Sequence, residues 1–194
     1  SQQWTCALQA LACRASFASA FSRAKSSLRA LVEPRPPSAS SSILSRWMGI
    51  ADANNAGNVH GGLIMHLCDE VAGIAAVRHS GARVVTAAMD RMNFRHPVFV
   101  GQLVTVKATV NAAWRTSMEV GVRVESENVR SGEVLHTSTA YLTMVALDDD
   151  GNPAEVPPLD PRTPDETRRA REAQLRRDTR LAERKRIEEE RASG

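Results

Sequence analysis

The residues best suited to chemistry in this sequence lie close together, between Asn54 and Asp69. The first part of this stretch is a loop that ends in two adjacent glycines, Gly61 and Gly62, where an apolar helical pattern begins. Glycine lets a ligand approach the backbone closely. The first N–H groups of a helix have no acceptor within the helix, so they can hold an anionic oxygen. The stretch therefore predicts a site that could stabilise an oxyanion.

Asp69 lies about two turns into the predicted helix. Its neighbours one turn away are Met65 and Gly73, so it shares a mainly apolar, close-packed side of the helix. A carboxylate in such surroundings needs either a bonding partner or a catalytic role, and one such role is that of a general base. The alternative is an exposed Asp69 beside Glu70 on a hydrated face, and the pattern alone leaves both interpretations open.

Other catalytic patterns are weak or absent. The group His60, His66, Asp69 and His79 lacks two histidines one turn apart on a helix, so we expect no metal site. The sequence has no Gly-x-Ser-x-Gly motif, which disfavours serine-type acyl transfer. Its glycines form neither a phosphate-binding Walker loop nor a dinucleotide fingerprint.

The elements that must position these residues can be predicted from their periodicity. A largely buried helix is expected over Gly61–His79 because apolar residues recur there at helical spacing. Period-two segments rich in Val, Thr and Met predict strands over Val84–Phe94, Leu103–Trp114, Met118–Val129 and Val134–Leu147, after a first strand around Ser42–Ile50. The fold class is therefore α+β, with one long helix packed on a curved antiparallel sheet of about five strands.

Both ends of the chain differ from this middle region. Residues 1–42 are rich in Ala, Ser, Leu and Arg, with Glu33 as their only acid, which fits either a transit peptide or a disordered leader. More than half of residues 160–194 are charged, and opposite charges three or four positions apart predict a solvated helical tail. We therefore expect one folded domain over residues 43–159.

The overall composition excludes several classes of protein. A net charge of +3 and 4% aromatic residues give no sign of a nucleic-acid-binding face. No apolar run approaches the roughly 20 residues that span a bilayer. The three cysteines, Cys6, Cys13 and Cys68, form no disulfide framework, so a reducing compartment is expected. The cytoplasm is favoured, with a mitochondrion or plastid as the alternative if residues 1–42 are a transit peptide.

The residues from Asp52 to Gly62, with Met65 and the segment 69–73, resemble the hotdog-fold acyl-CoA thioesterases. The resemblance is to the bacterial single-domain acyl-CoA hydrolases and to the repeated domains of the cytosolic long-chain acyl-CoA hydrolase, and it covers residues 43–159. It implies hydrolysis of acyl-CoA to free fatty acid and coenzyme A. Asp69 matches the catalytic carboxylate, and Asn58 matches the loop asparagine that faces it from the partner subunit. The N–H of Gly62 would then stabilise the oxyanion.

The resemblance also implies a set of substrate contacts, a form of assembly and the absence of a cofactor. Thr86 would border the catalytic carboxylate, and the remaining expected substrate-binding residues are His60, Gly61, Asn93, Arg115, Thr116 and Ser117. Coenzyme A is part of substrate and product, so no separate cofactor is expected. A homodimer would hold two complete sites, and three dimers would form a hexamer.

Two other functions remain compatible with these residues. A hotdog hydroxyacyl dehydratase would need a histidine and an acid at the site, whereas Asn58 and Asp69 occupy those positions. A non-catalytic acyl-CoA-binding protein would use the same pocket without turnover. An added DNA-reading domain would favour this second alternative, and the sequence predicts none.

Overall fold

The computed structural model describes residues 33–90 and 92–193, and its folded unit begins at Pro34. This start lies before the predicted boundary at residue 43. Arg35 forms a bridge with Leu159, and the short helix η1 (Pro37–Ser40) is held by Ser40, whose hydroxyl accepts a hydrogen bond from the Val110 N–H. The segment is therefore fixed by residues far away in the sequence. The prediction of a transit peptide or leader covered residues 1–42, and its part over residues 1–32 lies outside the described residues.

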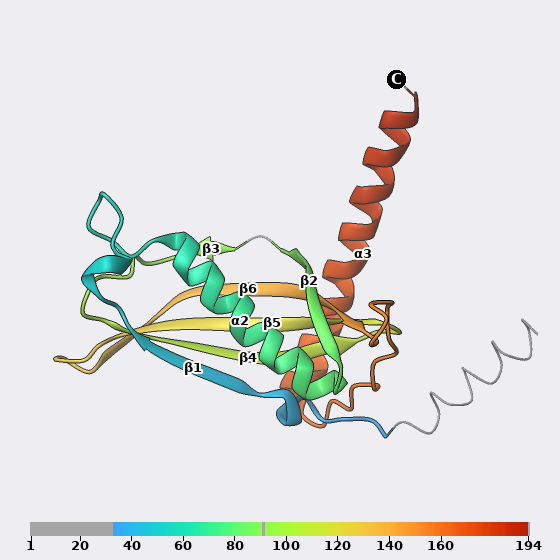
Figure 1. Cartoon of the computed structure of the whole chain (residues 1–194), viewed down its shortest axis with the longest axis horizontal. Coiled ribbons are helices and arrows are strands. Elements are labelled where there is room, and N and C mark those ends of the chain that lie inside the picture. Colours follow the sequence, from blue (N-terminus) through green and yellow to red (C-terminus); the bar gives the residue numbers. More distant parts are fainter. Residues whose placement is uncertain (1–32, 91, 194) are drawn as a thin grey trace, which may run out of the picture. The chain divides into compact units, whose positions relative to one another are not determined.

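The sheet is antiparallel and has the strand order β1-β4-β5-β6-β2 (Figure 1). Its strands are β1 (Ser42–Trp47), β2 (Arg83–Met89), β3 (Asn93–Phe94), β4 (Leu103–Ala113), β5 (Ser117–Asn128) and β6 (Glu133–Leu147). The strand predicted over Val84–Phe94 is divided into β2 and β3, which both pair with β6. With β2 and β3 counted as one interrupted strand, the predicted sheet of about five strands is confirmed.

The helix α2 (Gly61–Ser80) lies along the concave face of the sheet and supplies much of the core. Its buried residues include Ile64, Leu67 and Val71, which pack with the buried valines and methionines of β4, β5 and β6. The helix ends at Ser80, and Gly81 after it adopts φ 71° and bonds its N–H to the Val77 carbonyl. The predicted helix over Gly61–His79 is thus confirmed, and the short helix η2 (Ile50–Asp52) precedes its loop.

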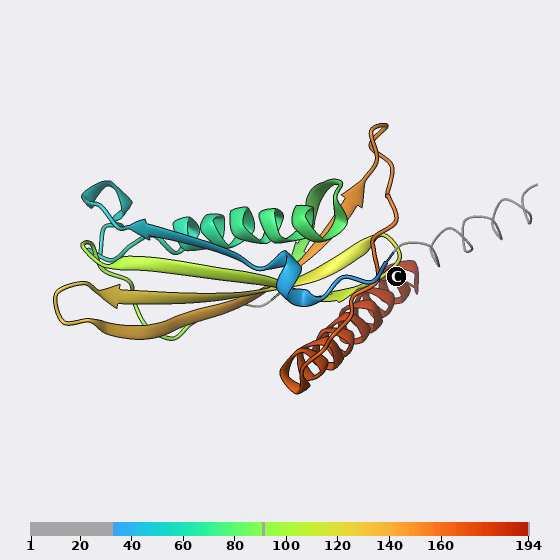
Figure 2. The ribbon, with the colours of Figure 1, turned by 90° about the horizontal axis from the view of Figure 1, so that it is seen from below.

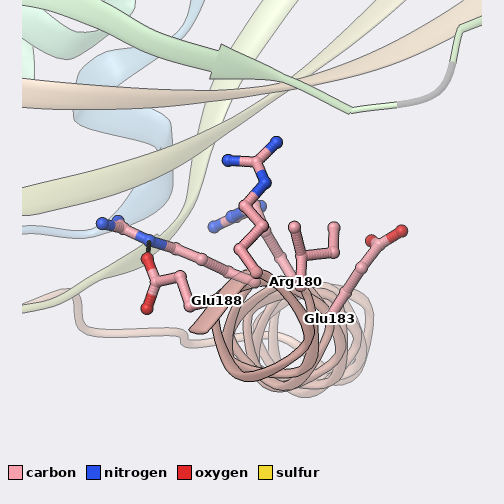
Figure 3. A pocket seen from close by; sticks show the side chains of 6 residues that line it. Arg180, Glu183 and Glu188 are labelled. Atoms are coloured by element: carbon pink, nitrogen blue, oxygen red, sulfur yellow. Dashed lines mark hydrogen bonds and ion pairs between the residues drawn. The ribbon is translucent and has the colours of Figure 1, made fainter. Parts of the chain in front are cut away.

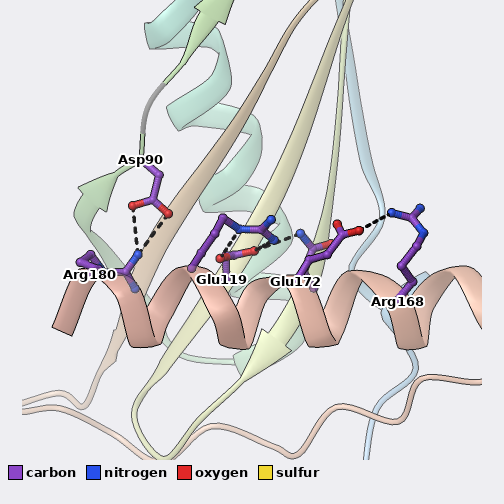
Figure 4. Close-up of polar contacts among 7 residues, drawn as sticks. Asp90, Glu119, Arg168, Glu172 and Arg180 are labelled. Carbon is purple, nitrogen blue, oxygen red and sulfur yellow. Dashed lines mark hydrogen bonds and ion pairs between the residues drawn. The ribbon is translucent and has the colours of Figure 1, made fainter. Parts of the chain in front are cut away.

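The charged tail forms the helix α3 (Pro164–Ser193) on the face of the sheet opposite α2 (Figure 2). Its first half is not the solvated helix that we predicted, because it packs on the sheet. Arg176 forms an ion pair of 2.6 Å with fully buried Glu119, and Arg180 forms one of 3.0 Å with Asp90 (Figure 4). Charge periodicity along the helix did not reveal these contacts because their partners lie in distant strands.

No helix among the described residues is both long enough and apolar enough to cross a membrane.

Candidate active site

The carboxylate of Asp69 has a defined partner on the neighbouring strand. Asp69 lies on α2, where it is half-buried, and the hydroxyl of Thr86 on β2 donates a hydrogen bond of 2.5 Å to its Oδ1. Glu70, the next residue, is exposed. The structure therefore supports a positioned Asp69 rather than a freely hydrated one, and it places Thr86 at the border of this carboxylate, as predicted.

Asp69 and Thr86 line an open cavity of about 650 Å³. Beyond the carboxylate, most of its surface is apolar and comes from α2, β2 and β6. The other lining residues are Glu70, Gly73, Ile74, Val77, Arg78, Arg83, Val84 and Met144. Charged side chains lie at its margins, so a long apolar group could lie along α2 with its reactive end beside Asp69.

The asparagine loop lies in a second cavity, of about 300 Å³, at the start of α2. Asn54 and Asn58 both line it, and both are half-buried. The side-chain oxygen of Asn54 accepts hydrogen bonds from the N–H groups of Ala56 at 2.9 Å and Asn58 at 3.2 Å. The backbone N–H of Asn54 also donates to the Asn58 carbonyl at 2.7 Å. These bonds fix the amide of Asn54 with its NH₂ group left to act as a donor.

The N-terminus of α2 offers the expected backbone donors. The N–H groups of Leu63 and Ile64 bond to the His60 carbonyl, whereas those of Gly61 and Gly62 have no acceptor among the described residues. A Cβ at Gly61 would lie 3.4 Å from the ring of Phe94, so this glycine allows close packing. A Cβ at Gly62 would have nothing within 4 Å, which leaves that position open for a ligand.

One chain does not bring the predicted catalytic residues together. Asp69 lines one cavity and Asn58 the other, and Asp69 is about 12 Å along α2 from Gly61 at a rise of 1.5 Å per residue. This separation agrees with the prediction that the two residues act from facing subunits. That prediction itself concerns a second chain and stays a prediction.

Residues 115–117, the turn predicted to contact coenzyme A, join β4 and β5 and line neither cavity. Arg115 is exposed, and its carbonyl accepts a bond from the Val156 N–H. The hydroxyl of Ser117 accepts a bond of 3.4 Å from Arg177 of α3, and the Thr116 carbonyl accepts one from Ala146. The other predicted substrate contacts, His60 and Asn93, are exposed at the start of α2 and on β3.

Cys68, although adjacent to Asp69, is unsuited to act as a nucleophile. Its side chain is fully buried in the core. Burial, and secondarily the charge of Asp69, raises the pKa of the Cys68 thiol to about 12. The thiol therefore stays protonated and inert at neutral pH.

Several residues of these cavities were not among the predicted site residues. One of them is Asn54, and its signal was local: an asparagine followed two and four residues later by N–H groups of the same loop. The apolar residues Ile74 and Met144 gave no such signal. Ile74 fits any buried helix face, and Met144 comes from β6, 75 residues after Asp69.

Comparison with known proteins defines the family of this fold and site. Residues 56–133 match the family model "Thioesterase superfamily". The protein VdlD of Helicobacter pylori is 36% identical over 139 residues, which cover 71% of this chain and 79% of VdlD. The cytosolic acyl coenzyme A thioester hydrolase of Rattus norvegicus is 38% identical over 146 residues, which cover 74% of this chain and 38% of that protein.

Solved structures agree with this relationship. An apo-hexameric acyl-CoA thioesterase superposes with a TM-score of 0.76 at 36% identity, covering 78% of this chain and 97% of the other. The acyl-CoA hydrolase of Staphylococcus aureus, solved with butyryl coenzyme A, superposes with a TM-score of 0.73 at 34% identity. The match covers 81% of this chain and 98% of the other. The chain therefore belongs to the thioesterase superfamily and has its hotdog fold. Within that superfamily it is a member of the acyl-CoA thioester hydrolases.

Proposed function

We propose that this protein hydrolyses acyl-CoA thioesters to a free fatty acid and coenzyme A, with Asp69 as the catalytic carboxylate. The observation that carries the proposal is the hydrogen bond from Thr86 to Asp69 at one end of an apolar cavity. This arrangement fits a substrate with a polar reactive group and an apolar chain. The activity named for the relatives, on acyl coenzyme A, has the same chemistry.

In the proposed mechanism, Asp69 orients a water molecule and accepts its proton as the water attacks the thioester carbonyl. The carbonyl oxygen becomes an oxyanion, and the N–H of Gly62 of the partner subunit donates a hydrogen bond to it, because Gly62 of the same chain lies about 10 Å along α2 from Asp69. The tetrahedral intermediate then collapses and expels the coenzyme A thiolate. The thiolate takes up the proton that Asp69 had accepted, which returns the carboxylate to its starting state.

Two asparagines could position the water or thioester from the partner subunit. Asn58 is the residue predicted from the sequence. Asn54 is supported by the spacing between three residues of a solved relative. Solved variants of the Staphylococcus aureus hydrolase replace, one at a time, an aspartate, an asparagine 15 positions before it and a threonine 17 positions after it. In this chain the same intervals separate Asn54, Asp69 and Thr86. The fixed amide of Asn54 gives a physical reason for the same choice.

We propose further that the active unit is a homodimer in which β2 of each chain pairs with β2 of the other. β2 is an edge strand with free backbone groups, and such an edge is a template for pairing with another chain. Exposed apolar residues beside it, Val85 on β2 with Ile74 and Val77 on α2, would be covered. The hexameric state of solved relatives supports three such dimers, and the rat relative's cytosolic name supports the predicted cytoplasmic location.

The test is release of free thiol from short, medium and long acyl-CoAs by the wild-type protein and by Asp69→Asn. Loss of a general base should lower kcat by about 10²- to 10⁴-fold. Glu155→Gln is the control, because it neutralises an exposed carboxylate that lines neither cavity and should retain activity. A folded, oligomeric wild-type protein that hydrolyses no acyl-CoA would refute the proposal and favour a binding role.

A further inference from the structure

The helix α3 crosses the outer face of the sheet and continues past its edge. Its contacts follow the strand order: Arg176 pairs with Glu119 of β5 and lies over the Tyr141 ring of β6, and Arg180 then pairs with Asp90, just after β2. β2 is the last strand of the sheet. Residues 181–193, here called the α3 arm, therefore extend beyond this edge (Figure 1).

The α3 arm is long enough to reach over a second sheet. At 1.5 Å per residue it measures roughly 20 Å, which equals the width of about four strands at a spacing of 4.8 Å. Every residue of the arm is exposed, and no side-chain hydrogen bond or ion pair joins it to the rest of the described chain. A solvated helix of this length has little stability of its own.

The face of α3 that packs on its own sheet continues along the arm. Ala173, Arg176 and Arg180 lie on that face at spacings of three and four residues, and the next positions in the series are Arg184, Ile187 and Arg191. Together with Arg180, Glu183 and Glu188, these next residues line a hollow of about 450 Å³ (Figure 3). All six lining residues belong to α3, so no other element of residues 33–90 and 92–193 covers this face.

A dimer formed through β2 places a complementary surface at this point. If β2 (Arg83–Met89) pairs antiparallel with itself about its middle residue, Met89 lies beside Arg83 of the second copy. Within each chain, Arg83 donates a hydrogen bond of 2.9 Å to the Asp148 carbonyl and so holds the exposed turn 148–150 next to the start of β2. That turn is Asp148-Asp149-Asp150, here called the acidic turn.

We infer that the α3 arm of each chain docks on a second copy of this chain, with Arg184 and Arg191 facing the acidic turn of that copy. The inference rests on the β2-paired dimer of the proposed function. Two-fold symmetry then gives two identical contacts, one for each arm. Arg184 already pairs with Glu188 at 2.7 Å, but both side chains are exposed and such a pair is weak, so Arg184 can bond to new carboxylates.

Charge reversal on the two faces of the arm tests this contact in the full-length protein. Arg184→Glu with Arg191→Glu should weaken self-association at least about tenfold, because carboxylates would then oppose the acidic turn. The matched control is Lys185→Glu with Arg186→Glu on the opposite face. It makes the same change in charge and also breaks one exposed i,i+4 pair, yet it should associate like the wild type. Sedimentation velocity over a concentration series measures the dissociation constant of the dimer.

A complementary variant makes the test specific to the proposed partner. Asp149→Arg with Asp150→Arg should also weaken association, since arginines would oppose the arm. Mixing the arm variant with this turn variant in equal amounts should restore near wild-type association, because both contacts in the mixed dimer then join opposite charges.

Three results would overturn the inference. The first is an arm variant that associates like the wild type, and the second is a control that is equally weakened. The third is a mixture that stays dissociated. A wild-type protein that is monomeric would instead refute the β2-paired dimer, and with it that part of the proposed function, whatever the arm variants do.

Discussion

The hydroxyl of Thr86 on β2 donates a 2.5 Å hydrogen bond to Oδ1 of Asp69 on α2. The two residues belong to different elements, which are joined by the turn at Gly81. This bond therefore fixes the proposed catalytic carboxylate relative to the edge strand of the sheet. It also leaves Oδ2 of Asp69 available to a water molecule.

Loss of this bond should lower turnover while the protein stays folded. Thr86→Ala frees the Asp69 carboxylate to rotate, and misplacement of a reacting group by about 1 Å costs about 10²-fold in rate. We expect kcat to fall by about 10- to 100-fold with a smaller change in KM. Thr86→Ser keeps the hydroxyl and should restore most of the activity in the same thiol-release assay. Equal losses in both variants would show that the hydroxyl has no positioning role.

The two asparagines of the loop can be separated by substitutions that preserve the loop. Asn54→Asp keeps the oxygen that accepts the N–H groups of Ala56 and Asn58 but replaces the NH₂ donor. If Asn54 is the residue that acts on the thioester, this variant should lose about 10²-fold or more in kcat with an unchanged melting temperature. Asn58→Ala, which retains both backbone bonds, should then keep its activity. The reverse pattern would support Asn58.

The buried ion pair under α3 should contribute strongly to stability. Glu119 is fully buried and accepts hydrogen bonds from Arg176 on both carboxylate oxygens. Arg176→Ala leaves that carboxylate without its charged partner and with only the amide of Asn111 as a donor, and such a loss costs about 3 to 5 kcal/mol for a buried charge. Arg168→Ala removes two exposed pairs, with Asp165 and Glu172, and should cost less than about 1 kcal/mol. Urea unfolding at one protein concentration compares the two variants, and similar losses would contradict the assignment.

The sequence predicted the elements of the fold because their signals are local. Helical periodicity from Gly61 and the turn chemistry at Gly81 define α2, and alternating apolar residues define β4, β5 and β6. The break between β2 and β3 was missed because it depends on distant partners. Asp90 bonds its N–H to the carbonyl of Tyr141 and its side chain to Arg180, which is 90 residues away.

The candidate site was predictable in a similar way. Asp69 stood out as an acid among apolar residues on one helix face, and the glycines marked the start of that helix. The pairing of Asp69 with Thr86 followed only from the family resemblance, since it requires α2 and β2 to pack side by side. The docking of α3 had no counterpart in the sequence, because a helix rich in Arg and Glu looks the same whether its partners are water or a buried Glu119.

A buried histidine should make the stability of the protein depend on pH. His79 is fully buried at the end of α2, where its Nε2 lies 3.0 Å from the Pro157 carbonyl and Nδ1 has no partner. Burial is the main cause that lowers the pKa of His79 below its usual 6.5, with a smaller contribution from the charge of Arg35. The bond to the Pro157 carbonyl partly opposes this shift.

The sign of the effect follows from proton linkage. Because the folded state binds a proton at His79 less readily than the unfolded state, this contribution to stability is fully present above pH 6.5. It is lost as the pH falls below 6.5 toward the folded-state pKa, at a rate of up to about 1.4 kcal/mol per pH unit. The free energy of unfolding, measured in urea at fixed protein concentration, should therefore decrease from pH 7 to pH 5.

His79→Gln removes the titrating group and can still donate to the Pro157 carbonyl, so its free energy of unfolding should fall less over the same range. His136 serves as the control, because its pKa is also lowered, by burial and by nearby Arg123, although it lies on β6 with a less buried ring. His136→Asn should keep most of the wild-type dependence on pH. If instead the His79 variant shows the full wild-type decrease, the protons taken up on unfolding bind elsewhere in the protein.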